Sequence, residues 1–416
     1  MDERNILGME IVMDLKKIHF SEWYYLLVVI GYIMTLVSGN VRPGIIASTL
    51  LLLVAVELLF QNRFQICGTM DILMAAYLIY NLLSGIWCIA YGMPVSVFLG
   101  EFSTTALPMI FYYVGRSIDE EGLKRFYGKF IVAVLLVGIT GVILYFTAPQ
   151  WYLDYLFDYG YISKADVSTM RIRMISVIGS ILMGYLSVAA MLAGAHVILH
   201  SNGKRGKIVF FVNCFLAFMS NQRSAMVVAL LVLLYVNYLI FFVFHMFPKK
   251  YFVMECAGIA AAFAGLCIVY FKAVLKIYYR LISLPGAIGQ RSDSWVSAAN
   301  NMKNIWLGNG LGANGHRAAG IQPYIVADGG LAKIFCEMGI IGTSIFIFLM
   351  ILVFKKGSRR LYKCAAELGI VGITLLQCIG SNMLEFQLST PIFWFAVGRC
   401  AAVIAEDEYK RLRNGE

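Results

Sequence analysis

The stretch KIYYRLISLPGAIGQRSDSWVSAANNMKNIWLGNGLGANGHRAAGIQPYIVADGGLAKIFCEMGIIG, residues 276–342, is the only long segment polar enough to fold outside a lipid bilayer. It is rich in Gly, Asn and Arg, whereas the segments before and after it are long and apolar. Of the 416 residues, 60% are hydrophobic and 14% are charged, and the mean hydropathy of +0.76 exceeds that of soluble globular domains. The composition predicts an integral membrane protein whose chemistry lies in this polar stretch.

Working outward, we find twelve segments that approach the length of about 20 apolar residues that a membrane-spanning helix needs. They lie approximately at residues 23–40, 43–60, 71–91, 94–115, 130–148, 174–199, 208–222, 224–247, 251–273, 331–354, 364–380 and 390–405. We therefore expect one integral membrane domain over residues 1–416, an all-α polytopic fold with about twelve transmembrane helices. Residues 149–173 would form a minor outer loop, and residues 274–330 a major outer loop between helices nine and ten.

The distribution of basic residues predicts the orientation. With both termini in the cytoplasm, 21 of the 34 Lys and Arg residues lie in inner segments, which is the positive-inside pattern. The net charge of +10 is then explained by an inner surface that faces anionic lipid, and no nucleic acid partner is required. None of the nine cysteines lies in either outer loop or forms a CxxC pair, so we expect no disulfide framework and no metal site.

Several arginines stand on the predicted outer side, against the positive-inside bias, and therefore need partners there. The turn SNQRS, residues 220–224, is too short to lift Arg223 from the edge of the bilayer, so its side chain either snorkels to headgroups or points into a cavity. Guanidinium groups bind phosphate oxygens in pairs and keep their charge when partly desolvated. A lipid-linked pyrophosphate would suit such a set, and the candidate binding residues are Arg171, Arg173, Arg223 and Arg291.

The major loop contains two local patterns. If residues 291–306 are helical, one face carries Arg291, Trp295, Ala299, Met302 and Trp306. This predicts an amphipathic helix with Arg291 on its buried side or at its start. The glycines of GNGLGANG, residues 308–315, match GxGxxG, but no βαβ unit surrounds them, so we exclude a dinucleotide site and expect a tight loop that approaches a ligand.

Three residues near this loop are candidates for proton transfer: His316, Asp328 and Glu337. Lys333 and Glu337 are four residues apart on the same predicted helix, where they can form an ion pair. Glu101 lies inside a hydrophobic segment, so it is either functional or hydrogen-bonded to a neighbouring helix.

Aromatic residues are concentrated in the minor loop, at Trp151, Tyr152, Tyr155, Tyr159 and Tyr161. Such residues are typical of the belt that marks a membrane surface. Their rings can also stack on the apolar faces of sugars. Both interpretations stay open from the sequence.

The order of these motifs resembles that of the O-antigen polymerase and O-antigen ligase superfamily. The resemblance is carried by SNQRS, by QRSDSW at 290–295, by WLGNGLGANG at 306–315, and by a polar residue ahead of KIFCEMGIIG at 333–342. It covers residues 170–345 in motifs and the whole chain in topology.

That resemblance implies a GT-C-like, metal-independent, inverting glycosyltransferase without a cofactor, in the inner (plasma) membrane of a bacterium. Its donor would be a glycan on undecaprenyl pyrophosphate and its product an O-antigen, a capsule or an exopolysaccharide. Partners would be membrane lipid, a chain-length regulator and a flippase. By position, Arg223 and Arg291 match the family's arginines.

One departure from the family pattern concerns Asp328, because the ligases typically have a histidine at this place. The difference favours a polymerase and leaves the general base open between Asp328, His316 and Glu337. The alternatives are a ligase that transfers finished glycan to a lipid or wall acceptor, and a non-enzymatic flippase for lipid-linked oligosaccharides.

Overall fold

The computed structural model describes residues 19–38, 41–64, 68–158, 173–201, 204–248, 250–254 and 284–414, together with residue 66 and scattered residues between 257 and 282. All regular secondary structure in these residues is helical. Eight helices in the described part are long and apolar enough to cross a membrane. The predicted all-α, membrane-type architecture is therefore confirmed at this level. The described residues contain eight candidate spans, and the number of twelve stays a prediction.

The helices follow the chain in this order: α2 (Phe20–Ser38), α3 (Pro43–Phe60), α4 (Thr69–Ala90), α5 (Val95–Glu101), η1 (Phe102–Ala106), η2 (Leu107–Ile110), α6 (Phe111–Ser117), α7 (Glu120–Thr147), α8 (Gln150–Asp158) and α10 (Ser180–Ser201). The second half contains α11 (Lys204–Met219), α12 (Arg223–Tyr238), η4 (Leu239–Val243), α15 (Leu284–Asn300), η5 (His316–Ala318), α16 (Gly330–Gly357), η6 (Ser358–Arg360), α17 (Leu361–Gln377), η7 (Met383–Glu385) and α18 (Thr390–Asn414).

Helices occupy eleven of the twelve predicted hydrophobic segments. The remaining segment, 251–273, lies largely outside the described residues, so the structure does not test it. Among the described residues, α11 has only 16 residues and α18 is not one of the eight candidates. Helices α16 and α17, with η6 between them, form the single candidate Gly330–Gln377.

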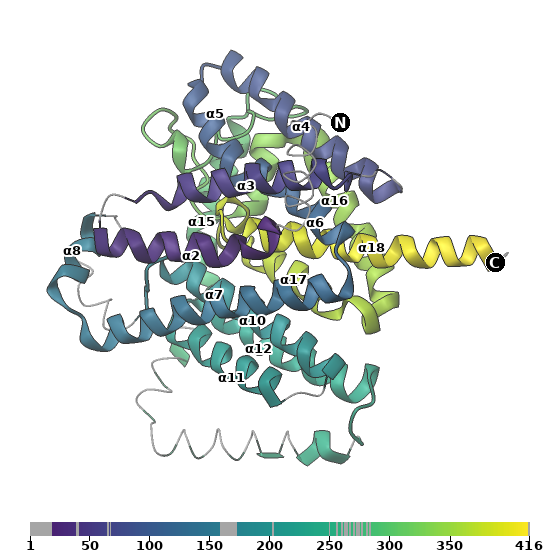
Figure 1. The fold of residues 1–416 in the computed structure, drawn as a ribbon. Helices are drawn as coiled ribbons and strands as arrows, with labels where there is room; N and C mark the ends of the chain where they lie inside the picture. Colours follow the sequence, from purple (N-terminus) through teal and green to yellow (C-terminus); the bar gives the residue numbers. More distant parts are fainter. Residues whose placement is uncertain are drawn as a thin grey trace, which may run out of the picture.

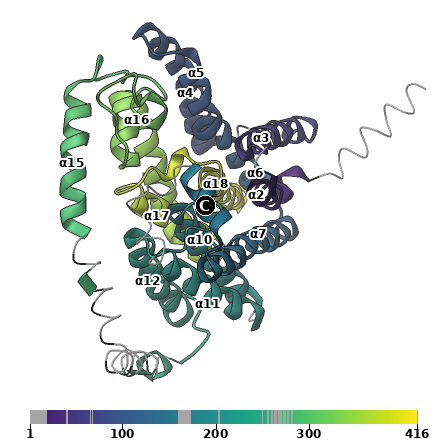
Figure 2. The same ribbon diagram turned by 90° about the vertical axis from the view of Figure 1, so that its left-hand side faces the viewer.

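The bundle is built around α10. In the most apolar 18-residue stretch of this helix, 89% of the residues are buried. In Figure 1, α2, α3, α7, α10 and α18 run side by side, and Figure 2 views the bundle from one end, with α10 surrounded by its neighbours. The close approach of α10 and α12 depends on small residues. A Cβ at Gly184 of α10 would lie only 2.6 Å from the Cβ of Ala225 on α12. On the periphery, apolar side chains such as Leu52 and Ile86 are 56% and 67% exposed, as expected for surfaces that contact lipid.

The amphipathic helix of the major loop is shifted relative to its prediction. It runs from Leu284 to Asn300, so Arg291 lies in its middle and not at its start. Trp295 and Ala299 pack, as predicted, against a small core formed by Ala298, Val326 and Cys336. Figure 2 shows α15 lying across the direction of the bundle helices, beside α16.

The helix stops before Trp306 because the following residues make local side-chain hydrogen bonds. Asn304 Oδ1 accepts from the backbone N–H groups of Trp306 and Leu307 at 2.8 and 3.0 Å. Such bonds offer the backbone an alternative to the helix. Trp306 is consequently 59% exposed, and its predicted place on the buried face is wrong.

Helix α16 is broken at Gly339, whose φ of 60° is non-helical. The loop from the major outer segment fills the break: Ile340 N–H donates to Ile305 O at 2.9 Å, and Gly310 N–H donates to Glu337 O at 2.9 Å. Backbone groups freed by the break thus find partners in the loop. This insertion fixes residues 305–310 against the first turns of α16, which carry the charged residues described below.

Candidate active site

A cavity of about 360 Å³, here called the arginine cavity, brings together three of the predicted arginines. Arg173 comes from the segment before α10, Arg223 is the first residue of α12, and Arg291 comes from α15. Asp328, which lies just before α16, shares the same cavity. The remaining lining residues are Ile181, Gln222, Ser224, Val227, Val228, Leu231, Leu376, Ile379, Gly380 and Ser381.

Arg223 is positioned by the tight turn between α11 and α12. Asn221 adopts a positive φ of 48°, which turns the chain sharply after α11. The side chain of Gln222 then donates from Nε2 to Ser180 Oγ at 2.6 Å, which ties the turn to the first residue of α10. The sequence left two locations open for the Arg223 side chain, the lipid headgroups and a cavity between helices. In the structure, Arg223 lines the cavity.

Arg173 is positioned by the non-helical segment that follows it and by α8. Met174 N–H donates to Met219 O at 3.0 Å, which ties the segment to the end of α11. The hydroxyls of Tyr152 and Tyr155 donate to Ser176 O and Val177 O at 2.9 and 3.3 Å. These two tyrosines are buried, so neither a membrane belt nor a sugar platform describes them.

The other aromatic residues of the minor loop have different positions. Trp151 is 52% exposed, as a belt residue would be. Tyr159 and Tyr161 lie outside the described residues, and so does the candidate Arg171.

Arg291 and Asp328 form an ion pair in the cavity. Arg291 Nη2 lies 3.1 Å from Asp328 Oδ2, and Arg291 Nη1 donates to Gly380 O at 2.6 Å. The two side chains are 35% and 37% exposed, so both remain accessible to a ligand. The guanidinium group is therefore fixed between a carboxylate and a carbonyl while part of it still faces the cavity.

The backbone at Asp328 is held by α15. Trp295 Nε1 donates to Asp328 O at 2.5 Å. The next residue, Gly329, has a φ of 125° and lies so close to the indole that a Cβ there would approach Trp295 Nε1 to 2.4 Å. Gly329 is also the N-cap of α16. Only glycine tolerates both the positive φ and the contact with the indole. Gly329 therefore fixes the backbone orientation at Asp328.

An apolar groove of about 220 Å³ borders the arginine cavity. It lies between α12 and α17, and two residues, Leu231 and Leu376, line both spaces. The rest of its lining is Val232, Tyr235, Phe354, Leu368, Gly369, Gly372 and Ile373. A ligand with a charged head and a long apolar tail could occupy the two together.

His316 and Glu337, the other candidates for proton transfer, do not line the arginine cavity. His316 begins the short η5 turn and is exposed. Glu337 is 2% exposed, and its Oε1 accepts from Asn314 N–H at 3.1 Å. Of the three candidates, only Asp328 lies with the arginines.

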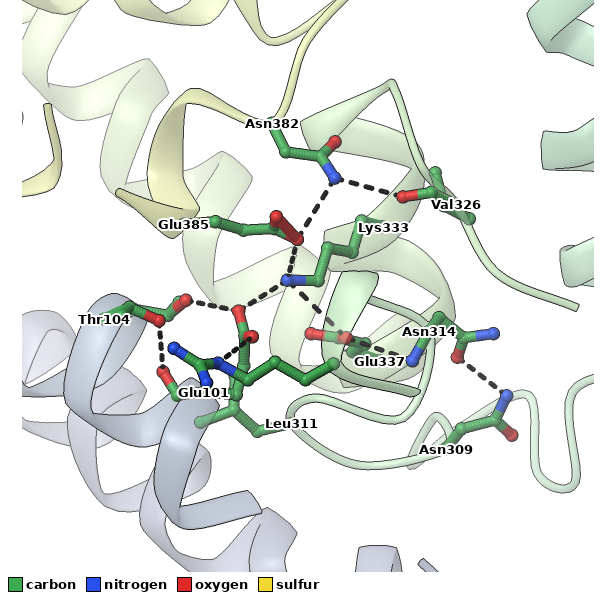
Figure 3. Close-up of polar contacts among 12 residues, drawn as sticks. Glu101, Thr104, Asn309, Leu311, Asn314, Val326, Lys333, Glu337, Asn382 and Glu385 are labelled. Atoms are coloured by element: carbon green, nitrogen blue, oxygen red, sulfur yellow. Dashed lines mark hydrogen bonds and ion pairs between the residues drawn. The ribbon is translucent and has the colours of Figure 1, made fainter. Parts of the chain in front are cut away.

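Glu337 belongs instead to a buried charge cluster, shown in Figure 3, which consists of Lys333, Glu101, Glu337 and Glu385. Lys333 Nζ lies 2.5 Å from Glu101 Oε1 and 3.7 Å from Glu337 Oε1, and it also pairs with Glu385. The predicted Lys333–Glu337 pair is confirmed. Glu101 accepts a further hydrogen bond from Thr105 Oγ1 at 2.7 Å, so the buried acid is satisfied by its neighbours.

The glycines of GNGLGANG approach protein and not an open ligand site. Gly308, Gly310 and Gly312 have φ values of 78°, 90° and 88°. A Cβ at Gly308 would lie 2.3 Å from Glu337 O, and one at Gly310 would lie 2.4 Å from Cys88 Cβ. The close approach was predicted, but it serves to dock the loop on α4, α5 and α16.

Several parts of the site have no local signal in the sequence. The carbonyl of Gly380 and the apolar groove come from helix packing alone. The contact of Glu385 with Lys333 likewise joins residues that belong to different helical elements. Only the arginines and Asp328 could be selected in advance.

No protein-family model matches this chain, and no curated protein sequence matches it.

Proposed function

We propose that this protein is a membrane glycosyltransferase that polymerises undecaprenyl-pyrophosphate-linked oligosaccharide repeat units into a surface polysaccharide. The observation that carries the proposal is that the arginine cavity and the apolar groove are adjacent and share the lining residues Leu231 and Leu376. A polyprenyl pyrophosphate has the matching chemistry, since it joins an anionic diphosphate to a long apolar chain.

The charge of the arginine cavity supports an anionic ligand. Its titratable lining residues are three arginines and one aspartate, so the cavity carries an excess of positive charge. Guanidinium groups bind phosphate oxygens in bidentate geometry and remain charged in a partly desolvated site. In this proposal Arg173, Arg223 and Arg291 bind the pyrophosphate of the donor.

The proposed reaction is a displacement at the anomeric carbon of the donor glycan. The acceptor hydroxyl oxygen forms the new bond to that carbon, while the bond from the carbon to the pyrophosphate oxygen breaks with inversion. The electron pair leaves with the pyrophosphate, whose developing charge is stabilised by the arginines. Asp328 accepts the proton of the hydroxyl, because it is the carboxylate that lies beside those arginines.

The proposed location is the outer face of a bacterial plasma membrane, with both termini in the cytoplasm. The distribution of Lys and Arg supports this orientation. In Figure 1, α8 and the C-terminus lie at opposite ends of the bundle, as expected if the minor loop is outside and the C-terminus inside.

The test is the size distribution and sidedness of undecaprenyl-linked glycans in membranes of cells that lack the gene and are complemented with variants. The variant R223A should accumulate single repeat units on the outer face and give no polymer ladder. The matched control K303A removes an exposed positive charge of the same outer segment that lines no described cavity, and it should restore the ladder. Accumulation on the inner face would indicate a flippase, and intact but unattached polymer would indicate a ligase; either result would overturn the proposal.

A further inference from the structure

A second polar cavity, of about 420 Å³, lies between α3, α5 and the segment before α18, and it is here called the Arg42 cavity. Its cationic lining residues are Arg42, the N-cap of α3, and Arg317, from the η5 turn. None of its lining residues belongs to the arginine cavity. The mechanism proposed above does not use it.

The walls of the Arg42 cavity combine an anion-binding end with an apolar end. Gln387 Nε2 donates to Gly44 O and to Ser48 Oγ, both at 3.0 Å, which fixes one polar wall. C-terminal to Arg42, on α3, the cavity is lined by Ile45 and Leu52, which are 61% and 56% exposed. This division suits a lipid whose anionic headgroup lies at Arg42 and whose chain follows α3.

Both arginines are available to a ligand. Arg42 is exposed, and within the described part of the chain no carboxylate is in ion-pair contact with it. The side chain of Arg317 is 46% exposed, and its Nε lies 3.7 Å from Glu101 Oε2. Gly100 leaves room for it, since a Cβ there would lie 2.9 Å from Arg317 Nη1. The guanidinium group is therefore placed by α5 and still faces the cavity.

The two cavities are connected by the buried charge cluster. From Arg317 the contacts lead to Glu101 and then to Lys333, which also pairs with Glu385. Glu385 Oε1 accepts from Asn382 Nδ2 at 3.1 Å, and the same amide donates to Ala327 O at 3.1 Å. Ala327 directly precedes Asp328 of the arginine cavity. A chain of polar contacts thus runs from the Arg42 cavity to the backbone carbonyl next to the proposed base.

We infer that Arg42 and Arg317 bind the pyrophosphate of a second undecaprenyl-linked glycan, which is the acceptor. This inference rests on the proposed function, in which two lipid-linked glycans react. The acceptor hydroxyl belongs to a sugar remote from its own pyrophosphate, so its headgroup needs a place apart from the donor's. Two separate cationic cavities, each bordered by apolar helix surface, meet this requirement.

The experiment counts the undecaprenyl pyrophosphate molecules bound to the full-length protein by native mass spectrometry from detergent micelles. The wild type should bind two per chain. The variants R42E and R317Q should each weaken binding of one molecule about tenfold, as expected for loss of a charge-assisted hydrogen bond. R223A should lose the other molecule. The control K303E makes the same charge change as R42E on an exposed side chain and should still bind two.

The outcomes separate this inference from the proposed function. If the wild type binds one molecule, which R223A loses and R42E keeps, the second site is wrong and the donor site stands. If R42E loses a molecule but R223A does not, the donor assignment fails. If equimolar phosphatidylglycerol displaces the molecule that depends on Arg42, the cavity holds an ordinary phospholipid headgroup, and the acceptor assignment is overturned.

Discussion

At the scale of single residues, the proposed chemistry depends on Asp328 and on how its position is fixed. Its carboxylate pairs with Arg291, its carbonyl accepts from Trp295, and Gly329 behind it has a backbone conformation that favours glycine. Arginines on the predicted outer side could be selected from the sequence because charges at the outer edge of a membrane protein need partners. The partners of these arginines could not be selected from the sequence, since Arg291 contacts the carbonyl of a residue 89 positions away.

Replacing Asp328 with Asn should lower kcat for polymerisation about 100-fold or more, because a positioned general base typically contributes 10²–10⁴. KM for the donor should change little, since the arginines remain. The matched control D293N alters an exposed acid on α15 and should leave both constants unchanged. The measurement is steady-state elongation of lipid-linked glycan, and a D328N variant with wild-type kcat would exclude Asp328 as the base.

Replacing Gly329 with Ala should lower the free energy of unfolding by about 1–3 kcal/mol, which is the usual cost of a strained backbone conformation. It should also reduce activity, because the added Cβ displaces Trp295 and with it Asp328. Gly320 is the matched control, since it too has a positive φ, of 80°, but its Cβ would meet no atom within 4 Å. G320A should lose stability and keep activity. Equal activities of the two variants would contradict the positioning role of Gly329.

At the scale of elements, the junctions of the major loop with α15 and α16 build the site. The sequence pattern predicted that α15 exists and that Trp295 faces protein, because apolar residues recur at helical spacing. It did not predict where α15 ends, since asparagine side chains compete with the helix only once the chain turns. The break of α16 at Gly339 was likewise hidden, because the loop that fills it lies about 30 residues earlier in the chain.

The buried charge cluster should be essential for the stability of this junction. Replacing Lys333 with Met leaves Glu101, Glu337 and Glu385 without their shared cation, and removing one partner of a buried pair typically costs about 3–5 kcal/mol. Denaturant unfolding in detergent should show this loss for K333M and almost none for the exposed control K303M. The double variant K333M/E337Q should be more stable than K333M, because one uncompensated carboxylate becomes neutral. If K333M had the stability of the wild type, the stabilising role of the buried charge cluster would be excluded.

The apolar groove can be tested without touching the arginines. Gly372 lines it, and a Cβ there would meet only Phe354, at 4.0 Å, so G372L should fill the groove and leave the fold intact. We expect affinity for undecaprenyl pyrophosphate to fall about tenfold, since several buried methylene groups lose contact. Affinity for inorganic pyrophosphate should not change. G128L on α7 is the control, and an unchanged affinity of G372L for the lipid would exclude the groove as the tail site.

At the scale of the whole molecule, the composition was sufficient to predict an all-helical membrane protein, because 60% hydrophobic residues must be buried in protein or lipid. Helices also fill nearly all of the predicted segments. Spatial relations were beyond the sequence: neither the convergence of Arg173, Arg223 and Arg291 nor the polar path between two cavities follows from spacing along the chain. The proposed reaction between two lipid-linked substrates would use the two cationic cavities, one for each substrate.

The central claim is that the arginine cavity binds a lipid pyrophosphate that leaves during glycosyl transfer. The most direct measurement uses the purified full-length protein in liposomes with undecaprenyl-pyrophosphate-linked repeat units. We predict one released undecaprenyl pyrophosphate for each new glycosidic bond, with loss of both products in R223A and normal yields in K303A. Movement of the glycan across the bilayer without release of undecaprenyl pyrophosphate would contradict the claim.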